Sequence, residues 1–540
     1  MNKIFRLLAL LLAVVLICAA AGNSLRSEGE DQGEGEDENV DEDKSIGEKD
    51  EGVALDAAVD ELGQVVSELE ETVRQRAKEL AEEKAKSNPS RARVTELSEE
   101  LKIHREAAGK LLSDNPETLA WIEEHSYFED LSKGLPTPEH RLSGPNCMWR
   151  TNPALGDVNQ DGYLDIAAKP RKGKWGIRCW LYDGKGGWID SSEGLPAGFM
   201  AGGGLKFADI NKDGNLDIIV GAHGMGIAAY FGDGEGKWTE ASNGLKGLPV
   251  TADAMDVAVA DFDEDGHLDI VFAGWHANTG IVVFAGDSKG NWKRMQTTGL
   301  PDAGHASAMI SADFNNDGHM DIAGSIARVT SRQYDPVWLN DGKGNFINGS
   351  IGINILRNGG TWGVATGDLN GDGNLDLVFG GSLWPQLEMT QALQVYLGNG
   401  LGIWKQVEME QGDTSYKGVA MADLDGDGNL DVVGFAGTSN LVVHHGDGRG
   451  GFELMKVKGI ENLNLPSWGI AAGDIDGDGF ADIIGGVGTE GGMGDIMNKQ
   501  VGKPVYVGGY VKAWFSRPRE ILIKKRLKEL DILIEKALES

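Results

Sequence analysis

The stretch that decides the fold is Asp423-Leu-Asp-Gly-Asp-Gly-Asn-Leu-Asp431. Three acidic residues occupy alternate positions, a glycine follows the third, and a fourth Asp ends the stretch. The alternation places several short oxygen-bearing side chains on one side of a tight loop, and Gly428 permits the backbone reversal that this requires. Oxygen donors at this density suit Ca²⁺, which takes roughly six to eight oxygen ligands.

The same nine-residue pattern occurs seven times, at intervals of 51 to 55 residues. Numbering its positions 1 to 9, we expect side-chain ligands at positions 1, 3, 5 and 9 and a backbone carbonyl ligand at position 7. The predicted calcium ligands are Asp157, Asn159, Asp161, Tyr163 and Asp165; Asp209, Asn211, Asp213, Asn215 and Asp217; Asp261, Asp263, Asp265, His267 and Asp269; Asp313, Asn315, Asp317, His319 and Asp321; Asp368, Asn370, Asp372, Asn374 and Asp376; Asp423, Asp425, Asp427, Asn429 and Asp431; and Asp474, Asp476, Asp478, Phe480 and Asp482. A single copy has an acidic turn without metal as its alternative, but seven intact ligand sets favour up to seven structural calcium ions. The three loops with Asp at position 3 are expected to bind calcium more tightly than the four with Asn, because they carry more charge.

Each loop lies within a unit of four short predicted strands. An Ala/Gly-rich strand precedes the loop, an apolar strand follows it, and a Gly-rich turn joins a third strand to an outer one. Seven such units predict an all-β, seven-bladed β-propeller. The seventh unit lacks its outer strand, while residues 127–135 form an isolated outer strand with the Gly-Leu-Pro ending of the other units. We therefore expect this strand to close blade seven and remove the exposed sheet edges.

The acidic loops, together with turns such as Leu339-Asn-Asp-Gly-Lys-Gly-Asn-Phe346, make residues 127–515 resemble FG-GAP/VCBS repeats, which also form the propeller of integrin α-subunits. The literal Phe-Gly and Gly-Ala-Pro signatures are poorly kept, with Phe379-Gly380-Gly381 a partial match, so the resemblance is closer to the bacterial type. Proteins with such repeats include lectins and polysaccharide lyases. The resemblance therefore implies either recognition or sugar processing.

The remaining segments have distinct compositions. Residues 1–21 have a basic start and an apolar run of the length of a secretory signal, which predicts cleavage and a secreted, cell-surface or periplasmic protein. Residues 22–53 are acidic and nearly without apolar side chains, so we expect a disordered linker. The segment 54–125 is predicted to be helical, 126–516 to be the propeller, and 517–540 to be an amphipathic helix that docks back. No transmembrane segment is expected after the signal.

The helical segment has two interpretations. Val59, Leu62, Val66, Leu69 and Val73 recur at alternating spacings of three and four residues, the pattern of a coiled coil. Residues 54–86 are therefore predicted either to form one arm of a helical hairpin or to join copies of the chain into a homo-oligomer.

Charge and cysteine content limit the function. The chain has 84 acidic and 50 basic residues, a net charge of −34, which argues against nucleic acid or an anionic membrane as partner. Bound cations would offset part of this excess. After signal cleavage only Cys147 and Cys179 remain, either as a disulfide or as two buried thiols.

Propeller topology places the calcium loops and Gly-rich turns on one face, and the more variable loops on the opposite face. Aromatic and basic residues on such loops suit a glycan or an extracellular protein. The candidate ligand-binding residues are Trp149, Arg171, His276, His305, Arg332, Trp362, Tyr416 and Trp468. Packing between blades is the alternative for any single Trp.

The sequence contains no Ser/His/Asp order, HExxH motif or Gly-rich phosphate loop, so we predict no catalytic residues and no organic cofactor. A recognition or adhesion module is the favoured function. A lyase-like enzyme acting through a residue such as Arg332 or His305 is one alternative, and a purely structural surface protein is another.

Overall fold

The computed structural model divides into two compact units, Tyr127–Arg517 and the combination of Met1–Ser126 with Pro518–Ser540, which we describe separately. The structure describes residues 65–66, 69, 71–86, 89–113, 126–136, 149, 152–170, 176–197, 203–222, 226–245, 254–274, 280–302, 306–326, 336–354, 361–381, 392–409, 416–436, 440–455, 457–458, 467–488, 509–516, 527, 530 and 532–538. The predicted signal peptide and acidic linker lie outside these residues.

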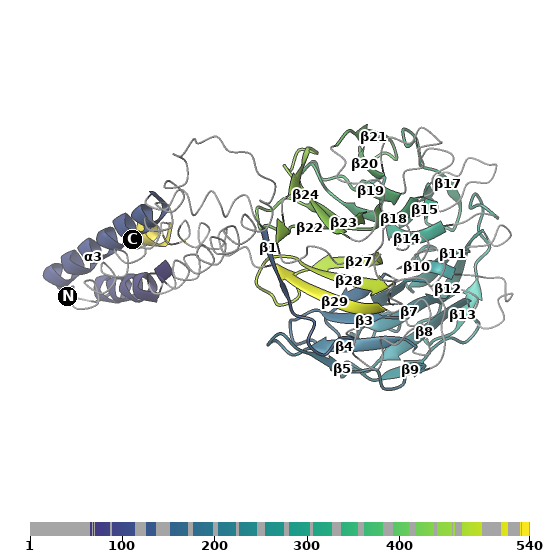
Figure 1. The fold of residues 1–540 in the computed structure, drawn as a ribbon, viewed down its shortest axis with the longest axis horizontal. Coiled ribbons are helices and arrows are strands. Elements are labelled where there is room, and N and C mark those ends of the chain that lie inside the picture. The colour runs from purple at the N-terminus through teal and green to yellow at the C-terminus, as the bar shows by residue number, and fades with distance from the viewer. Residues whose placement is uncertain are drawn as a thin grey trace, which may run out of the picture. The chain divides into compact units, whose positions relative to one another are not determined.

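The larger unit is built from seven antiparallel sheets, as the sequence predicts. Figure 1 shows them around a common centre, with first strands such as β18 and β27 innermost and fourth strands such as β21 and β9 at the rim. The first strands are β2 (Ala154–Gly156), β6 (Leu205–Ala208), β10 (Ala254–Ala260), β14 (Ala306–Ala312), β18 (Thr361–Gly367), β22 (Tyr416–Ala422) and β27 (Ser467–Gly473). The second strands are β3 (Asp165–Ala168), β7 (Asp217–Ala222), β11 (Asp269–Gly274), β15 (Asp321–Ile326), β19 (Asp376–Gly381), β23 (Asp431–Ala436) and β28 (Asp482–Gly488).

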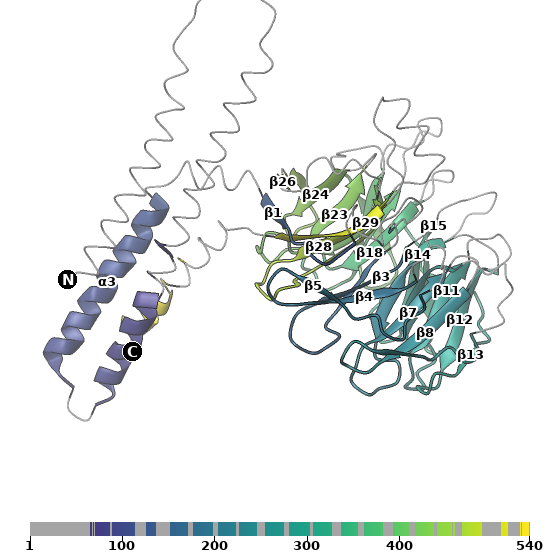
Figure 2. The same cartoon turned by 60° about the horizontal axis from the view of Figure 1, so that its bottom comes forward.

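The outer half of each blade follows the same order. The third strands are β4 (Arg178–Tyr182), β8 (Gly226–Gly232), β12 (Ile281–Gly286), β16 (Val337–Asn340), β20 (Leu393–Gly398), β24 (Asn440–Gly446) and β29 (Gly509–Ser516). The fourth strands are β5 (Trp188–Asp190), β9 (Trp238–Glu240), β13 (Trp292–Arg294), β17 (Phe346–Asn348), β21 (Trp404–Val407), β25 (Phe452–Met455) and, for blade seven, β1 (Ser126–Asp130). Figure 2 shows consecutive strands of one blade, such as β11, β12 and β13, lying side by side.

Blade seven joins the two ends of the propeller sequence. Strand β1 pairs antiparallel with β29, so that Phe128 lies opposite Ser516 and Asp130 opposite Trp514. A short strand, β26 (Val457–Lys458), extends this sheet beyond β1. Residues from the start of the propeller therefore occupy the outer position that the sequence assigns to 127–135.

Contacts between blades explain the recurring Gly-Leu-Pro ending. Gly134, which has a φ of 102°, lies so close to blade one that an added Cβ would be 2.2 Å from the carbonyl oxygen of Trp188. Only glycine fits both this left-handed backbone and this close approach. The Trp188 indole nitrogen donates to the carbonyl of Leu131 at 2.8 Å, and Trp238, Trp292 and Trp404 make the equivalent bond to the preceding blade.

The smaller unit has its own apolar core. Helix α3 (Arg91–Ser113) contributes Leu97 and Leu101, residues 71–84 form a second helical stretch, and residues 532–538 form a C-terminal one (yellow beside α3 in Figure 1). Val66, Leu69 and Val73, part of the coiled-coil pattern, are buried in this core with Leu527, Leu530 and Ile534. The structure thus shows the intramolecular packing alternative and the predicted docking of the C-terminal helix, while oligomerisation through 54–86 stays untested.

Two further predictions concern single features. Among the described residues, no helix has the length and apolar character needed to cross a membrane. Cys179 is buried in β4, and Cys147 lies outside the described residues, so the disulfide alternative is not tested.

Candidate functional site: the acidic loops and the central cavity

Every acidic loop needs left-handed backbone at two positions. Position 6 is glycine in all seven loops, with φ between 84° and 91°. Position 4 is glycine in loops five to seven, but in loops one to four it is Gln160, Lys212, Glu264 and Asn316, with φ between 57° and 63°. Left-handed backbone is costly for side-chain-bearing residues, and it persists where the surrounding structure holds it. These turns keep the oxygens of positions 1, 3 and 5 on the inner side of the loop.

The Asp at position 9 fastens the loop to the blade. It is the first residue of the second strand and is completely buried. In loop one, Asp165 Oδ2 accepts the backbone N–H of Val158 at 2.8 Å and Oδ1 accepts that of Tyr182, on the third strand, at 2.9 Å. The equivalent pair of bonds occurs in all seven loops. Position 9 therefore has a structural role that the sequence analysis did not assign to it, beside its predicted role as a ligand.

Burial also changes the acidity of these carboxyl groups. Removal from water raises the pKa of Asp165 and Asp269 to about 7 and that of Asp482 to about 8, while the backbone hydrogen bonds oppose the rise. The neighbouring carboxylates of the same loop add to it. A bound cation would reverse this effect by favouring the ionised form.

The four loops with Asn at position 3 share one arrangement. In loop one the Asn159 amide donates to Asp161 Oδ2 at 2.9 Å, and Asp157 accepts the backbone N–H groups of Asp161 and Gly162. The same amide-to-carboxylate bond occurs in loops two, four and five. One amide thus replaces one carboxylate and lowers the negative charge of these loops.

The loops with Asp at position 3 concentrate negative charge instead. Oxygens of Asp261, Asp263 and Asp265 lie within 4.8 Å of one another, as do oxygens of positions 1, 3 and 9 of loop seven. The buried Oδ1 atoms of Asp261 and Asp474 have no hydrogen-bond donor among the described residues. A buried carboxylate oxygen without a donor is costly unless a cation binds it. Positions 1, 3 and 5 of loops three and six, and positions 1, 3 and 9 of loop seven, therefore bring together carboxylates that suit a calcium ion. The ligands of the four Asn-containing loops and the carbonyl ligands at position 7 stay predictions.

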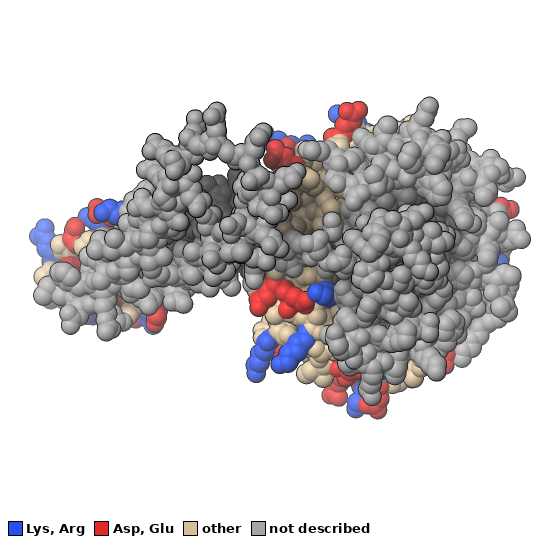
Figure 3. Space-filling model, viewed as in Figure 1, with Lys and Arg blue, Asp and Glu red and all other residues tan. Residues whose placement is uncertain are grey.

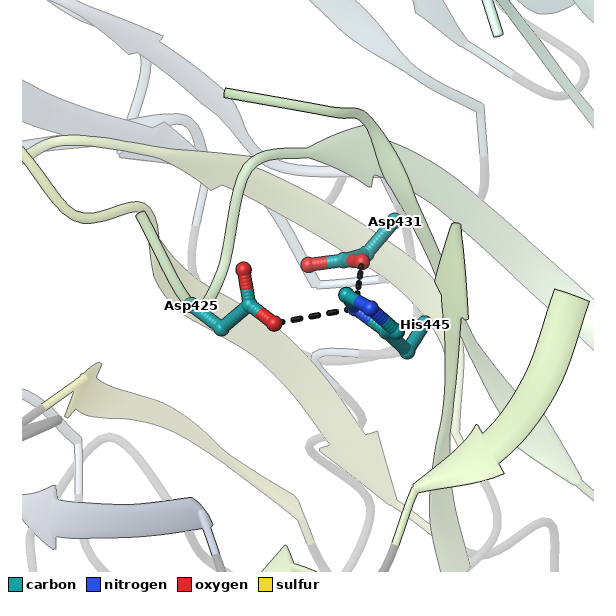
Figure 4. Close-up of side chains that lie close together, drawn as sticks. All are labelled: Asp425, Asp431 and His445. Atoms are coloured by element: carbon teal, nitrogen blue, oxygen red, sulfur yellow. Dashed lines mark hydrogen bonds and ion pairs between the residues drawn. The ribbon is translucent and has the colours of Figure 1, made fainter. Parts of the chain in front are cut away.

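Loop six has an additional partner for its carboxylates. His445, near the end of β24, places Nδ1 at 2.9 Å from Asp425 Oδ2 and at 3.2 Å from Asp431 Oδ1, as Figure 4 shows. Its Nε2 lies 3.8 Å from Asp427 Oδ2. Hydrogen bonds to Asp425 and Asp431 raise the pKa of His445 to about 10. The adjacent His444 differs, since it is buried against the Tyr416 hydroxyl at 3.1 Å, and burial lowers its pKa to about 4.

Neighbouring loops are tied to one another on their face of the propeller. Gln160 of loop one donates to the backbone oxygen of Gly214 and to Asn215 in loop two, and Asn316 of loop four donates to Asn374 in loop five. Glu264 of loop three pairs with His319 of loop four. In each case a position-4 side chain contacts the next loop. These contacts link loop one to loop two, and loops three, four and five to one another.

The predicted ligand-binding residues lie in different surroundings. Trp149 is completely buried against Trp180, with ring centroids 5.5 Å apart, and Tyr416 is completely buried against His444. Neither presents its side chain at the surface, so we leave both out of the proposed ligand face. Trp362 is half-buried at an irregularity in β18. Only the backbone of Trp468 is described, and Arg171, His276, His305 and Arg332 lie outside the described residues.

A central cavity of about 410 Å³ lies among the first strands of the seven blades. Its wall combines apolar and polar surface, with Lys206 and Asp256 as the charged side chains among the lining residues. Asp256 is buried, accepts the backbone N–H of Met309 at 3.1 Å and lies 3.7 Å from the Lys206 ammonium. Burial raises the pKa of Asp256, and the Lys206 charge opposes the rise. Cavities of this size with a few polar groups are typical ligand sites.

The described surface carries charged side chains of both signs. Figure 3 shows basic and acidic side chains interspersed over the described part of the face that it presents.

Comparison with known proteins agrees with this architecture. The FG-GAP-like repeat family matches residues 157–220, 209–272, 261–324, 326–379 and 423–485, and the FG-GAP repeat matches residues 467–507. Together these matches span more than half of the chain. The chain belongs to the FG-GAP repeat family. Each of the first three FG-GAP-like matches begins at position 1 of an acidic loop and ends in the second strand of the next blade, so each of these matches includes an acidic loop.

Individual relatives cover this FG-GAP protein less completely. Cartilage acidic protein 1 of Mus musculus and that of Homo sapiens are each 30% identical over 158 residues, which is 26% of this chain and 22% of theirs. The chain thus spans about a fifth of the length of these curated relatives. Among solved structures, the BP39L lectin from Burkholderia pseudomallei has a TM-score of 0.44 at 16% identity, over 63% of this chain and 93% of its own. A structure of BBS1N in complex with ARL6DN has a TM-score of 0.42 at 9% identity, over 73% and 98%.

Two features of the candidate site escaped the sequence analysis. His445 is detectable by aligning the third strands, because the residue at its position is apolar in every other blade. Asp256 is a single acidic residue within the apolar strand β10. It can be recognised as a candidate ligand contact only when the strand is known to line a cavity.

Proposed function

We propose that this FG-GAP propeller is an exported, calcium-stabilised recognition or adhesion module that binds a glycan or an extracellular protein. The fold itself supports a recognition or adhesion-type module in general. The observation that carries the proposal is that each acidic loop holds together the strands of its own blade through position 9. Calcium in these loops would then stabilise the scaffold, and ligand contacts would come from other parts of the ring.

The central cavity supports a polar ligand. Its charged pair, Lys206 and Asp256, combines donors with acceptors, and the polar residues Asn152 and Thr366 also line the wall. Sugar hydroxyls and protein backbone groups both offer complementary donors and acceptors. The half-buried Trp362, which does not line this cavity, is a separate candidate on β18, since an aromatic ring suits the apolar face of a sugar.

The test is binding of the full chain to a glycan array and to a panel of immobilised extracellular proteins, in millimolar calcium and in EDTA. We expect retention in calcium, weakening in EDTA, and loss of retention in a Lys206→Met variant. Lys405→Met is the matched control, because Lys405 lies exposed on the outer strand β21. No retention on either panel by the folded protein in calcium would contradict the proposal.

The same samples distinguish the enzyme alternative. A lyase-like enzyme would release shortened products from a polysaccharide, whereas a recognition module retains the polymer unchanged. Product release that His305→Ala or Arg332→Ala abolishes would replace the proposed function with that alternative.

A further inference from the structure

The sixth loop differs from the others in the residue that faces its carboxylates. In each blade, one residue of the third strand donates its backbone N–H to the position-9 Asp. The residue immediately before that donor is apolar in six of the seven blades. These six residues are Leu181, Phe231, Ala285, Leu339, Leu397 and Phe515. In blade six this residue is His445, immediately before Gly446.

Two carboxylates approach the same nitrogen of the His445 ring, an arrangement that suits a cation bound between the three side chains. Oxygens of Asp425 and Asp431 approach the same ring nitrogen, Nδ1, at 2.9 and 3.2 Å (Figure 4). One N–H group points well at a single acceptor, so it does not serve two carboxylates equally. A metal ion bound to Nδ1 can be coordinated by both oxygens at once.

The three side chains are already held in place. Asp431 accepts the backbone N–H groups of Gly446 and Leu424, one on each oxygen, which keeps a second lone pair of Oδ1 directed at the histidine. Asp425 Oδ1 accepts the N–H of Asp427 at 3.1 Å and leaves Oδ2 toward His445. Asp427 Oδ2 lies 3.8 Å from Nε2, which is longer than a hydrogen bond but on the side where an outer carboxylate orients many metal-binding histidines.

We propose that Asp425, Asp431 and His445 form a binding site for a divalent transition metal such as Zn²⁺, which distinguishes loop six from the six calcium loops. Calcium takes oxygen ligands, whereas imidazole nitrogen suits zinc and its neighbours in the first transition row. Ligands bound to tetrahedral zinc at roughly 2.0–2.2 Å lie about 3.4 Å apart. The Nδ1-to-oxygen distances therefore need only a small expansion to admit the ion, and three protein ligands leave a fourth position for water.

The experiment uses the full chain in excess calcium, so that the other loops are occupied before zinc is added. After incubation with several equivalents of Zn²⁺ and gel filtration, metal content is measured by atomic emission. We expect about one zinc per chain in the unmodified protein and in His267→Leu, and almost none in His445→Leu. His267 is a matched control because it belongs to an all-Asp loop, yet its Nδ1 contacts the Ser288 hydroxyl at 2.7 Å.

Leucine occupies the equivalent position in three other blades, so His445→Leu is expected to fold. If the leucine variant fails to fold, His445→Gln is the second variant, because glutamine keeps a polar side chain at this position. Cobalt provides a second readout, since Co²⁺ at the site would give visible absorption bands that either substitution removes. Equal zinc in His445→Leu and the unmodified protein would overturn the proposal. So would a lack of retained zinc in the unmodified protein, which would leave His445 as an ion-pair partner only.

Discussion

Loops three and six have the same acidic residues at positions 1, 3, 5 and 9, yet different surroundings. In loop three the third strand contributes Ala285 at the position of His445, and the buried Oδ1 of Asp261 has no donor among the described residues. In loop six the imidazole of His445 lies between Asp425 and Asp431. The comparison shows that a residue outside the nine-residue motif, on another strand, changes the groups that face a loop's carboxylates. Under our proposal, that residue selects the cation that the loop accepts.

The largest expected effect is the loss of calcium from the acidic loops. At about ten times the dissociation constant, each calcium ion adds about 1.4 kcal/mol, so six or seven ions contribute about 8–10 kcal/mol. That approaches the whole free energy of unfolding of a typical domain. Calorimetric melting in EDTA should therefore occur far below melting in millimolar calcium. Identical curves would mean that the loops hold together without a cation.

The next effect tests the role of position 9 without metal. Asp269→Ala leaves the buried N–H groups of Phe262 and Gly286 without acceptors, which should cost about 2–5 kcal/mol in EDTA. Asp265→Ala, at the exposed position 5 of the same loop, is the control and should cost far less under the same conditions. Urea unfolding of both variants measures the difference. If Asp269→Ala and Asp265→Ala lowered the free energy of unfolding by similar amounts, the structural role of position 9 would be contradicted.

A smaller effect should separate loop six from loop three directly. In EDTA, His445→Leu leaves Asp425 and Asp431 without the hydrogen bonds of the imidazole, and a bond to a charged group is worth about 1.5–3 kcal/mol. In calcium the same variant should recover most of that loss, because its loop now matches loop three. His267→Leu should be nearly neutral in both buffers. If His445→Leu lost the same free energy of unfolding in calcium as in EDTA, the proposed difference between loops six and three would be contradicted.

The pH dependence of stability should change sign with calcium. Burial raises the folded-state pKa of Asp165, Asp217, Asp269 and Asp321 to about 7, above the value near 3.9 in an unfolded chain. In EDTA the folded state therefore binds more protons, and stability falls as pH rises from about 4 through 7. In calcium these carboxylates are held ionised, so acidification displaces the ion and lowers stability. Melting temperatures across pH 5–8 in both buffers measure this, and slopes of the same sign would contradict it.

The smallest effect concerns charge at position 3. Asn315→Asp converts loop four to the composition of loop three and should tighten its calcium binding several-fold, because the added carboxylate replaces an amide. Asn348→Asp adds the same charge on the outer strand β17, away from the acidic loops, as a control. Isothermal titration measures the affinities. An equal gain in both variants would attribute the effect to net charge alone.

Repetition explains how much of this molecule was predictable. Seven copies of one loop predict the number of blades, and an unpaired strand at one end with a missing strand at the other predicts that β1 completes blade seven. The apolar spacing of Leu527, Leu530 and Ile534 likewise predicts their burial in the helical core.

Features present in only one blade were not predictable in this way. His445 replaces an apolar residue in a single third strand, and Asp256 interrupts a single first strand. Trp149 and Tyr416 were predicted on a ligand face, but the structure buries both, because large aromatic side chains also fill the space between strands. Side-chain direction of this kind depends on packing that the repeat pattern does not specify.

The central claim is that the acidic loops are cation sites whose number and kind follow from their surroundings. Equilibrium dialysis of the full chain against saturating calcium, with zinc removed, tests it most directly. The account predicts about six calcium ions per chain, rising to about seven in His445→Leu. A chain that binds at most one or two ions, with no gain in His445→Leu, would contradict it.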